Sequence, residues 1–169
     1  MTDETGDRRT AEDRAEHLKE RVYITFTALA VVLALRSHGA SAEEAGVTLL
    51  IAVTGTLLAV FVADVVSHIA VHAALPTEPE LRRMLRVSFG ALGALAVPFA
   101  FIGFAIAGSW PITSALRAAT IALVAALVVI GYLAVRRVRL PAWQKLIVLF
   151  AEFALGAAVV GLELLAHGA

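Results

Sequence analysis

The sequence predicts an all-α, polytopic membrane protein with five transmembrane helices, and three observations lead to this fold class. First, 60% of the 169 residues are hydrophobic, only 17% are charged, and the mean hydropathy is +0.85. A soluble domain of this length needs far more polar surface to cover its core. Second, apolar runs near or above the roughly 20 residues that cross a bilayer recur along the chain. Third, capping and turn residues separate these runs.

The first helix is expected to begin near Thr10, because Thr10-Ala11-Glu12-Asp13 resembles a capping box. It then crosses the membrane from about Tyr23 to Ser37, and Gly39 closes it. Basic residues before this run imitate a secretory signal peptide, but the many acidic residues there favour a retained span. We therefore expect residues 1–22 to be a short, partly helical, amphipathic cytoplasmic segment, and residues 23–169 to form one five-helix transmembrane domain.

The second helix is predicted to begin at the capping box Ser41-Ala42-Glu43-Glu44 and to run without a breaker to Leu75, before Pro76. At 1.5 Å per residue it is about 50 Å long, well beyond the ~30 Å hydrocarbon core. We therefore expect it to tilt or to project from the membrane.

The boundaries of the remaining helices are predicted from the same kind of capping and turn residues. Thr77-Glu78-Pro79-Glu80 caps the third helix, which reaches about Gly108 and bends near Pro98. The fourth begins at Pro111 and ends in a basic cluster at 136–139, and the fifth extends over 141–167.

The distribution of basic residues predicts the orientation. With five spans, twelve of the fourteen Lys and Arg residues fall on the side of the N-terminus. These are Arg8, Arg9, Arg14, Lys19, Arg21, Arg82, Arg83, Arg86, Arg136, Arg137, Arg139 and Lys145. Only Arg36 and Arg117 fall on the other side. The positive-inside rule then places the N-terminus in the cytoplasm and the C-terminus outside.

Ionisable residues inside the predicted spans are the main functional candidates, because each costs at least a few kcal/mol in a bilayer. Asp64, His68 and His72 are four residues apart on the second helix and share one face, and Thr54 extends the same face. On the fifth helix, Glu152 lies about 14 Å deeper than Trp143, close to the membrane midplane. The pattern favours an ion or proton pathway lined by these five candidates.

Other interpretations of the same residues stay open. Asp64 and Glu152 are also suited to interhelical hydrogen bonds that only stabilise packing. His68 and His72 are also suited to the headgroup level, near the end of an over-long helix. As an i, i+4 imidazole pair they are candidates for a metal site as well.

The leading hypothesis is a small homo-oligomeric channel or transporter for a small ion or proton in the bacterial cytoplasmic membrane. A non-transporting membrane interaction protein is the alternative, and an intramembrane HxxxH metalloenzyme is a weaker third. No catalytic residue is assigned, and no cofactor is expected. The chain has no cysteine, and its short connections leave no room for a soluble catalytic domain or a nucleic-acid surface. The expected partners are membrane lipids, further copies of the chain and the transported ion.

Overall fold

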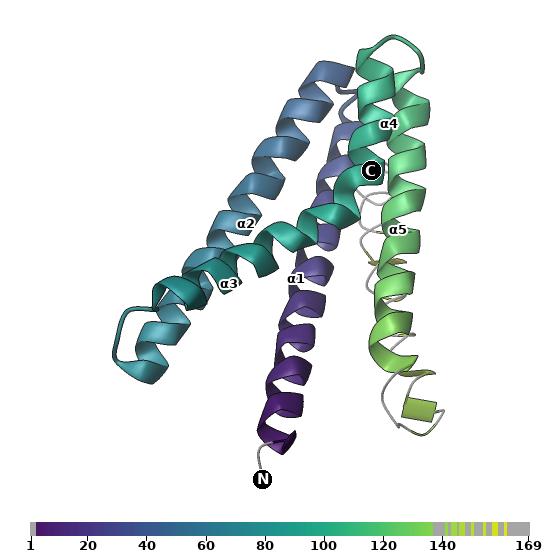
Figure 1. The fold of residues 1–169 in the computed structure, drawn as a ribbon. Helices are drawn as coiled ribbons and strands as arrows, with labels where there is room; N and C mark the ends of the chain where they lie inside the picture. Colours follow the sequence, from purple (N-terminus) through teal and green to yellow (C-terminus); the bar gives the residue numbers. More distant parts are fainter. Residues whose placement is uncertain are drawn as a thin grey trace.

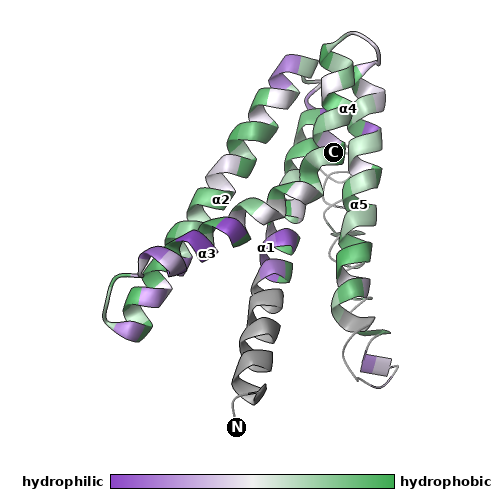
Figure 2. Ribbon diagram, viewed as in Figure 1, coloured by the Kyte–Doolittle hydropathy of each residue, from purple (hydrophilic) through white to green (hydrophobic). Residues whose placement is uncertain are grey.

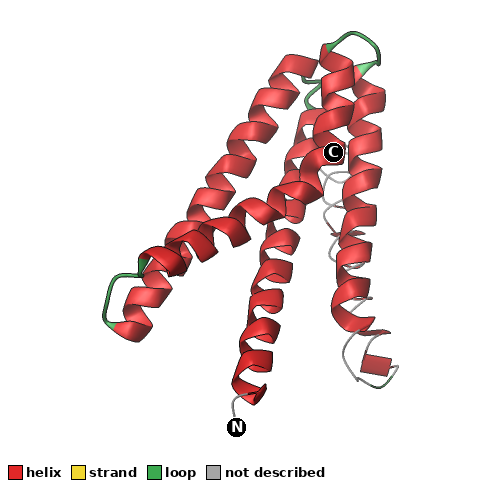
Figure 3. Ribbon diagram, viewed as in Figure 1, coloured by secondary structure: helices red, strands yellow, loops and turns green. Residues whose placement is uncertain are grey.

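The computed structural model describes residues 3–136, with side chains over 17–90 and 92–134, and separate positions between 141 and 161. Every regular element in the continuous part is a helix. These are α1 (Asp3–Ser37), α2 (Ala42–His72), α3 (Glu78–Gly90), the 3₁₀ helix η1 (Ala91–Leu95), α4 (Ala96–Ile106) and α5 (Ile112–Arg136). Short loops join them (Figures 1 and 3).

Helix α1 lies at the centre of the bundle and packs against α2 on one side and α5 on the other (Figure 1). Its buried stripe contains Ile24, Ala28 and Val32, at the four-residue spacing of one helix face. It is longer than expected, because it begins at Asp3 rather than near Thr10. It ends as predicted at Gly39, whose φ of 65° lies in the left-handed region that glycine enters without steric cost.

Helix α2 begins where the sequence predicts, since the Ser41 hydroxyl accepts a 3.2 Å hydrogen bond from the Glu44 N–H. It ends at His72, slightly before the expected Leu75. One narrow stripe of α2 is buried, and most of its remaining apolar surface is exposed or only half-buried. The stripe consists of Ala45, Leu49, Val53 and Leu57.

The third predicted helix is split into α3, η1 and α4. The 3₁₀ helix lies in the turn before Pro98, because the proline has no N–H to donate and its ring crowds the preceding turn. The Thr77 N–H and hydroxyl both donate to Glu80 Oε2 at 2.7 Å, which confirms the predicted cap. As a result α3 crosses α1 and α2, whereas α4 runs beside α5 (Figure 1). Figure 2 shows that α3 is also much more polar than the rest of the bundle.

Three helical stretches in the described part are long and apolar enough to cross a membrane: Ala42–His72, Glu78–Ile106 and Ile112–Ala134. By length and composition they are compatible with an integral membrane protein. The structure therefore shows three candidate spans rather than the five that the sequence predicts. Helix α1 is not among them, and its apolar stretch between Arg21 and Arg36 is about 21 Å long. The predicted fifth helix, 141–167, lies largely outside the described residues.

Candidate functional site

The most deeply buried ionisable side chain in the described part is Glu20 on α1, which is only 3% exposed. Its Oε1 accepts a hydrogen bond from the Ser88 hydroxyl of α3, and at 3.5 Å this bond is long and weak. Its Oε2 has no hydrogen-bond partner among the described residues. A buried polar atom without a partner costs free energy, so this oxygen calls for an explanation.

Asp64 on α2 supplies the explanation, because its carboxyl group interacts with that of Glu20. It lies two turns beyond Leu57 and so continues the stripe of α2 that packs against α1. Its side chain is half-buried. Two carboxyl groups form a hydrogen bond only when one of them carries a proton. The free Oε2 of Glu20 is therefore a place where a proton can be held between α1 and α2.

The surroundings of Glu20 favour its protonated form. Burial, then the negative charge of Asp64, then the short-range interaction between the two carboxyl groups raise the pKa of Glu20 from 4.5 to about 7. Lys19 and the Ser88 hydroxyl act in the opposite direction but do not offset the first three effects. Glu20 precedes the apolar stretch of α1. Because its pKa lies near neutral pH, the carboxyl pair can take up and release a proton in that pH range.

A second polar cluster lies further along α2, toward the α2–α3 loop. His68 is one turn after Asp64, and its Nε2 lies 3.7 Å from Oε2 of Glu80. The rings of His68 and His72 stack with their centroids 4.3 Å apart, and His72 Nδ1 lies 3.1 Å from the carbonyl oxygen of His68. The cluster thus connects the end of α2 to the beginning of α3. Among the described residues, no group of three or more His, Asp or Glu side chains is arranged to hold a metal ion.

The structure gives different neighbours to the residues that the sequence proposed for one pathway. Asp64 faces α1, His68 faces Glu80, and His72 stacks on His68. Thr54 is exposed on another face of α2, and Glu152 lies outside the described residues. The carboxyl that Asp64 meets is instead Glu20, which sequence reasoning left in the cytoplasmic segment.

One signal in the sequence points to Glu20. It stands four residues before Ile24 and eight before Ala28, both buried, so it continues the buried stripe of α1 by one turn. A charged residue on the core face of a helix is unusual, because buried carboxylates are rare unless they are paired. Extending that stripe beyond the apolar run identifies Glu20 as a candidate.

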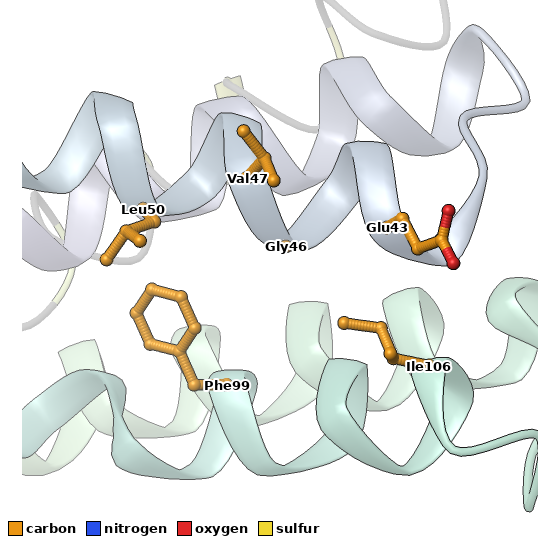
Figure 4. Close-up of a pocket in the computed structure, with 6 residues that line it drawn as sticks. All are labelled: Glu43, Gly46, Val47, Leu50, Phe99 and Ile106. Atoms are coloured by element: carbon orange, nitrogen blue, oxygen red, sulfur yellow. The ribbon is translucent and has the colours of Figure 1, made fainter.

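A groove of about 370 Å³ separates α2 from α4 near the α1–α2 turn (Figure 4). Its lining is apolar except for one carboxylate, and consists of Glu43, Gly46, Val47, Leu50, Phe99 and Ile106. A Cβ atom at Gly46 would lie 3.2 Å from Ile106 Cδ1, so glycine allows the two helices to approach closely there. The groove is open to the outside of the bundle and does not reach the Glu20–Asp64 pair.

The described clusters offer proton-transfer chemistry at the junction of α1, α2 and α3, with the carboxyl pair buried and the histidines nearer the surface. No family model, no curated protein and no solved structure matches this chain.

Proposed function

We propose that the protein is an integral membrane protein that moves protons across the membrane, with the Glu20–Asp64 carboxyl pair as the proton-binding site. The observation that carries this proposal is the buried, unpartnered Oε2 of Glu20, whose carboxyl group interacts with that of Asp64. An ionisable group buried in a membrane protein is costly, and such groups commonly mark ion or proton pathways. The raised pKa of Glu20, about 7, suits a group that gains and loses a proton at neutral pH.

The chemistry of the pair favours a proton over a larger cation. Two carboxyl groups and the Ser88 hydroxyl provide few oxygen ligands, whereas hard cations such as Ca²⁺ take six to eight. A shared proton, in contrast, needs only the two carboxyl groups. His68, one turn along α2, adds an imidazole, whose ring nitrogens can donate and accept hydrogen bonds, between the pair and the α2–α3 loop.

The proposal includes five spans, with α1 from Tyr23 and the segment 141–167 added to the three candidate spans. The N-terminus lies in the cytoplasm, because the basic residues gather on that side. Asp64 is then about 33 Å along α2 from its outer end, close to the inner boundary of the hydrocarbon core. The carboxyl pair thus opens toward the cytoplasm of a bacterial cell.

A symmetric homo-oligomer completes the pathway, because a single bundle of this size encloses little volume. The surface that a second copy would cover is the exposed side of α2, which carries Thr54 among large apolar side chains. These side chains are Val47, Leu50, Ile51, Leu58, Val62 and Val66.

The second candidate function is a non-transporting interaction protein in which the carboxyl pair only stabilises packing. The Ser88–Glu20 hydrogen bond favours it, because this contact links α3 to α1 whether or not a proton moves.

The full chain in liposomes that contain a pH-sensitive dye distinguishes the two functions. We expect proton flux in the wild type and a loss of about 10²-fold in Glu20→Gln and in Asp64→Asn, the lower end of what a positioned proton-transfer group contributes. Glu44→Gln, which removes an exposed carboxylate from the same helix as Asp64, is the matched control and should retain the flux. Absence of wild-type flux would reject transport in favour of the packing role. Wild-type rates in both variants would reject the carboxyl pair as the proton-binding site.

A further inference from the structure

At the end of the bundle opposite the α2–α3 loop, two arginines from distant parts of the chain line one polar pocket. Arg36 comes from the last turn of α1, and Arg117 comes from the second turn of α5. Together with Thr113 and Ser114 they line a cavity of about 290 Å³. The sequence has no other Lys or Arg between residues 22 and 81 or between residues 87 and 135, so this end of the described bundle has its basic residues concentrated at one point.

Neither guanidinium group is neutralised within the described residues. The ion pairs His68–Glu80 and Arg82–Glu78 both lie near the α2–α3 loop, away from these two arginines. The acidic residues at the end of the bundle where Arg36 and Arg117 lie are Glu43 and Glu44. Neither is within ion-pair distance of the two arginines, and Glu43 lines the separate groove between α2 and α4.

All four lining side chains are hydrogen-bond donors. Each guanidinium has five N–H groups in a planar fork, and the hydroxyls of Thr113 and Ser114 donate as well. The pocket also lies at the N-terminal turn of α5, where the Ser114 and Ala115 N–H groups are bonded to the Pro111 carbonyl at 3.0 and 3.1 Å. The helix dipole is positive at this end, so it adds to the two guanidinium charges instead of opposing them.

We propose that Arg36, Thr113, Ser114 and Arg117 form a binding site for a phosphate-type oxyanion. Two guanidinium forks match the oxygens of a phosphate group in bidentate geometry, and the two hydroxyls complete the set of donors. The phosphate belongs either to a lipid headgroup or to a soluble phosphate. Trp110 stands in the adjacent turn and is 42% exposed, as expected of an aromatic side chain at the level of lipid headgroups. The site does not depend on proton transport.

The test uses the full chain purified in detergent, in buffer of low ionic strength. Inorganic phosphate is titrated by calorimetry, and retention of phosphatidylglycerol against phosphatidylcholine is measured by native mass spectrometry. The variants are Arg36→Gln, Arg117→Gln and their combination. Arg86→Gln, which removes an exposed arginine from α3, is the matched control for loss of one positive charge.

Each single substitution is expected to weaken anion binding about 10-fold, and the double substitution about 100-fold, because each removes one charge-assisted bidentate contact. Arg86→Gln should bind like the wild type. Binding of free phosphate that weakens from the wild type to the single variants and further in the double variant identifies a soluble ligand. Retention of phosphatidylglycerol that weakens in the same series of variants, without binding of free phosphate, identifies a lipid headgroup.

The proposal is overturned if the double variant retains both probes as the wild type does, or if the wild type binds neither. Both arginines are exposed, so we expect helix content and melting temperature to be unchanged, and circular dichroism checks this. Substitution of Arg36 and Arg117 by lysine keeps both positive charges but removes the planar guanidinium groups. It should give intermediate binding, which separates a built oxyanion site from general attraction to positive charge.

Discussion

Helices α2 and α5 are similarly apolar and both long enough to cross a membrane, yet they are packed very differently. In the most apolar 18-residue window of each, 17% of α2 is buried inside the bundle against 39% of α5. Helix α5 packs along both α1 and α4, whereas α2 leans away from the bundle in Figure 1 and buries one stripe. Apolar side chains that face lipid and apolar side chains that face a core therefore look alike in the sequence.

A second contrast runs along α2 itself. The half near the α1–α2 turn contacts α1 through apolar side chains from Ala45 to Leu57. Beyond Leu57 the same stripe continues with Asp64 and His68, which contact carboxyl groups of α1 and α3. The first half packs through apolar side chains and the second half through ionisable ones, so we expect only the attachment of the second half to depend on pH.

The largest effect is expected in the core of α5. Leu123 is 0% exposed, so Leu123→Ala leaves a cavity and should lower the free energy of unfolding by about 2–5 kcal/mol. Ile121 on the same helix is 64% exposed, and Ile121→Ala should cost much less. Unfolding in mixed micelles measures both. Equal losses would show that the exposed side of α5 is packed in the assembled protein, and the contrast with α2 would then disappear.

The pH dependence of stability comes next. The pKa of Glu20 is raised to about 7 in the folded state, so the folded protein holds this proton more tightly than the unfolded chain does. The resulting stabilisation is complete below pH 4.5 and is lost as the pH rises through 7. We expect a loss of roughly 1–3 kcal/mol over that interval.

Glu20→Gln should remove this part of the pH dependence, whereas Glu44→Gln should keep it. Melting temperatures measured in detergent from pH 4.5 to 8 provide the comparison. An unchanged profile in Glu20→Gln would mean that another group controls the attachment of the polar half of α2.

Replacing the carboxyl pair by apolar residues separates stability from transport. Glu20→Leu combined with Asp64→Leu removes two ionisable groups together and leaves no lone carboxyl behind. Stability should be unchanged or higher by about 1–2 kcal/mol, as found when other buried ionic groups are replaced as a set. Proton flux should be lost in the same protein. Retained flux would contradict the proposed role of the pair.

The smallest effect is expected at the contact between His68 and Glu80, which lies near the surface. The His68 side chain is 12% exposed, but Glu80 is 45% exposed and the two groups are 3.7 Å apart. His68→Gln should therefore change the free energy of unfolding by less than about 1 kcal/mol. Arg82→Gln, which breaks the exposed Arg82–Glu78 pair of 2.6 Å, should have an effect of similar size. A much larger effect of His68→Gln would show that this contact, and not Glu20, attaches the polar half of α2.

Local chemistry explains which features of the fold could be predicted. The cap at Ser41, the cap formed by Thr77 and Glu80, and the bend before Pro98 each depend on residues within one turn of one another. The start of α1 at Asp3 departs from the prediction, because a helix held at one end by packing can extend beyond a local capping signal.

The sequence by itself determined that the chain is helical and apolar, where its caps lie, and that Asp64, His68 and His72 share one face of a helix. Only the tertiary structure decided which groups meet across helices. It brings Asp64 to Glu20, His68 to Glu80, and Arg36 to Arg117. The physical reason is that helical periodicity sets the direction of a side chain around its own axis, whereas the neighbour in that direction depends on how the helices cross.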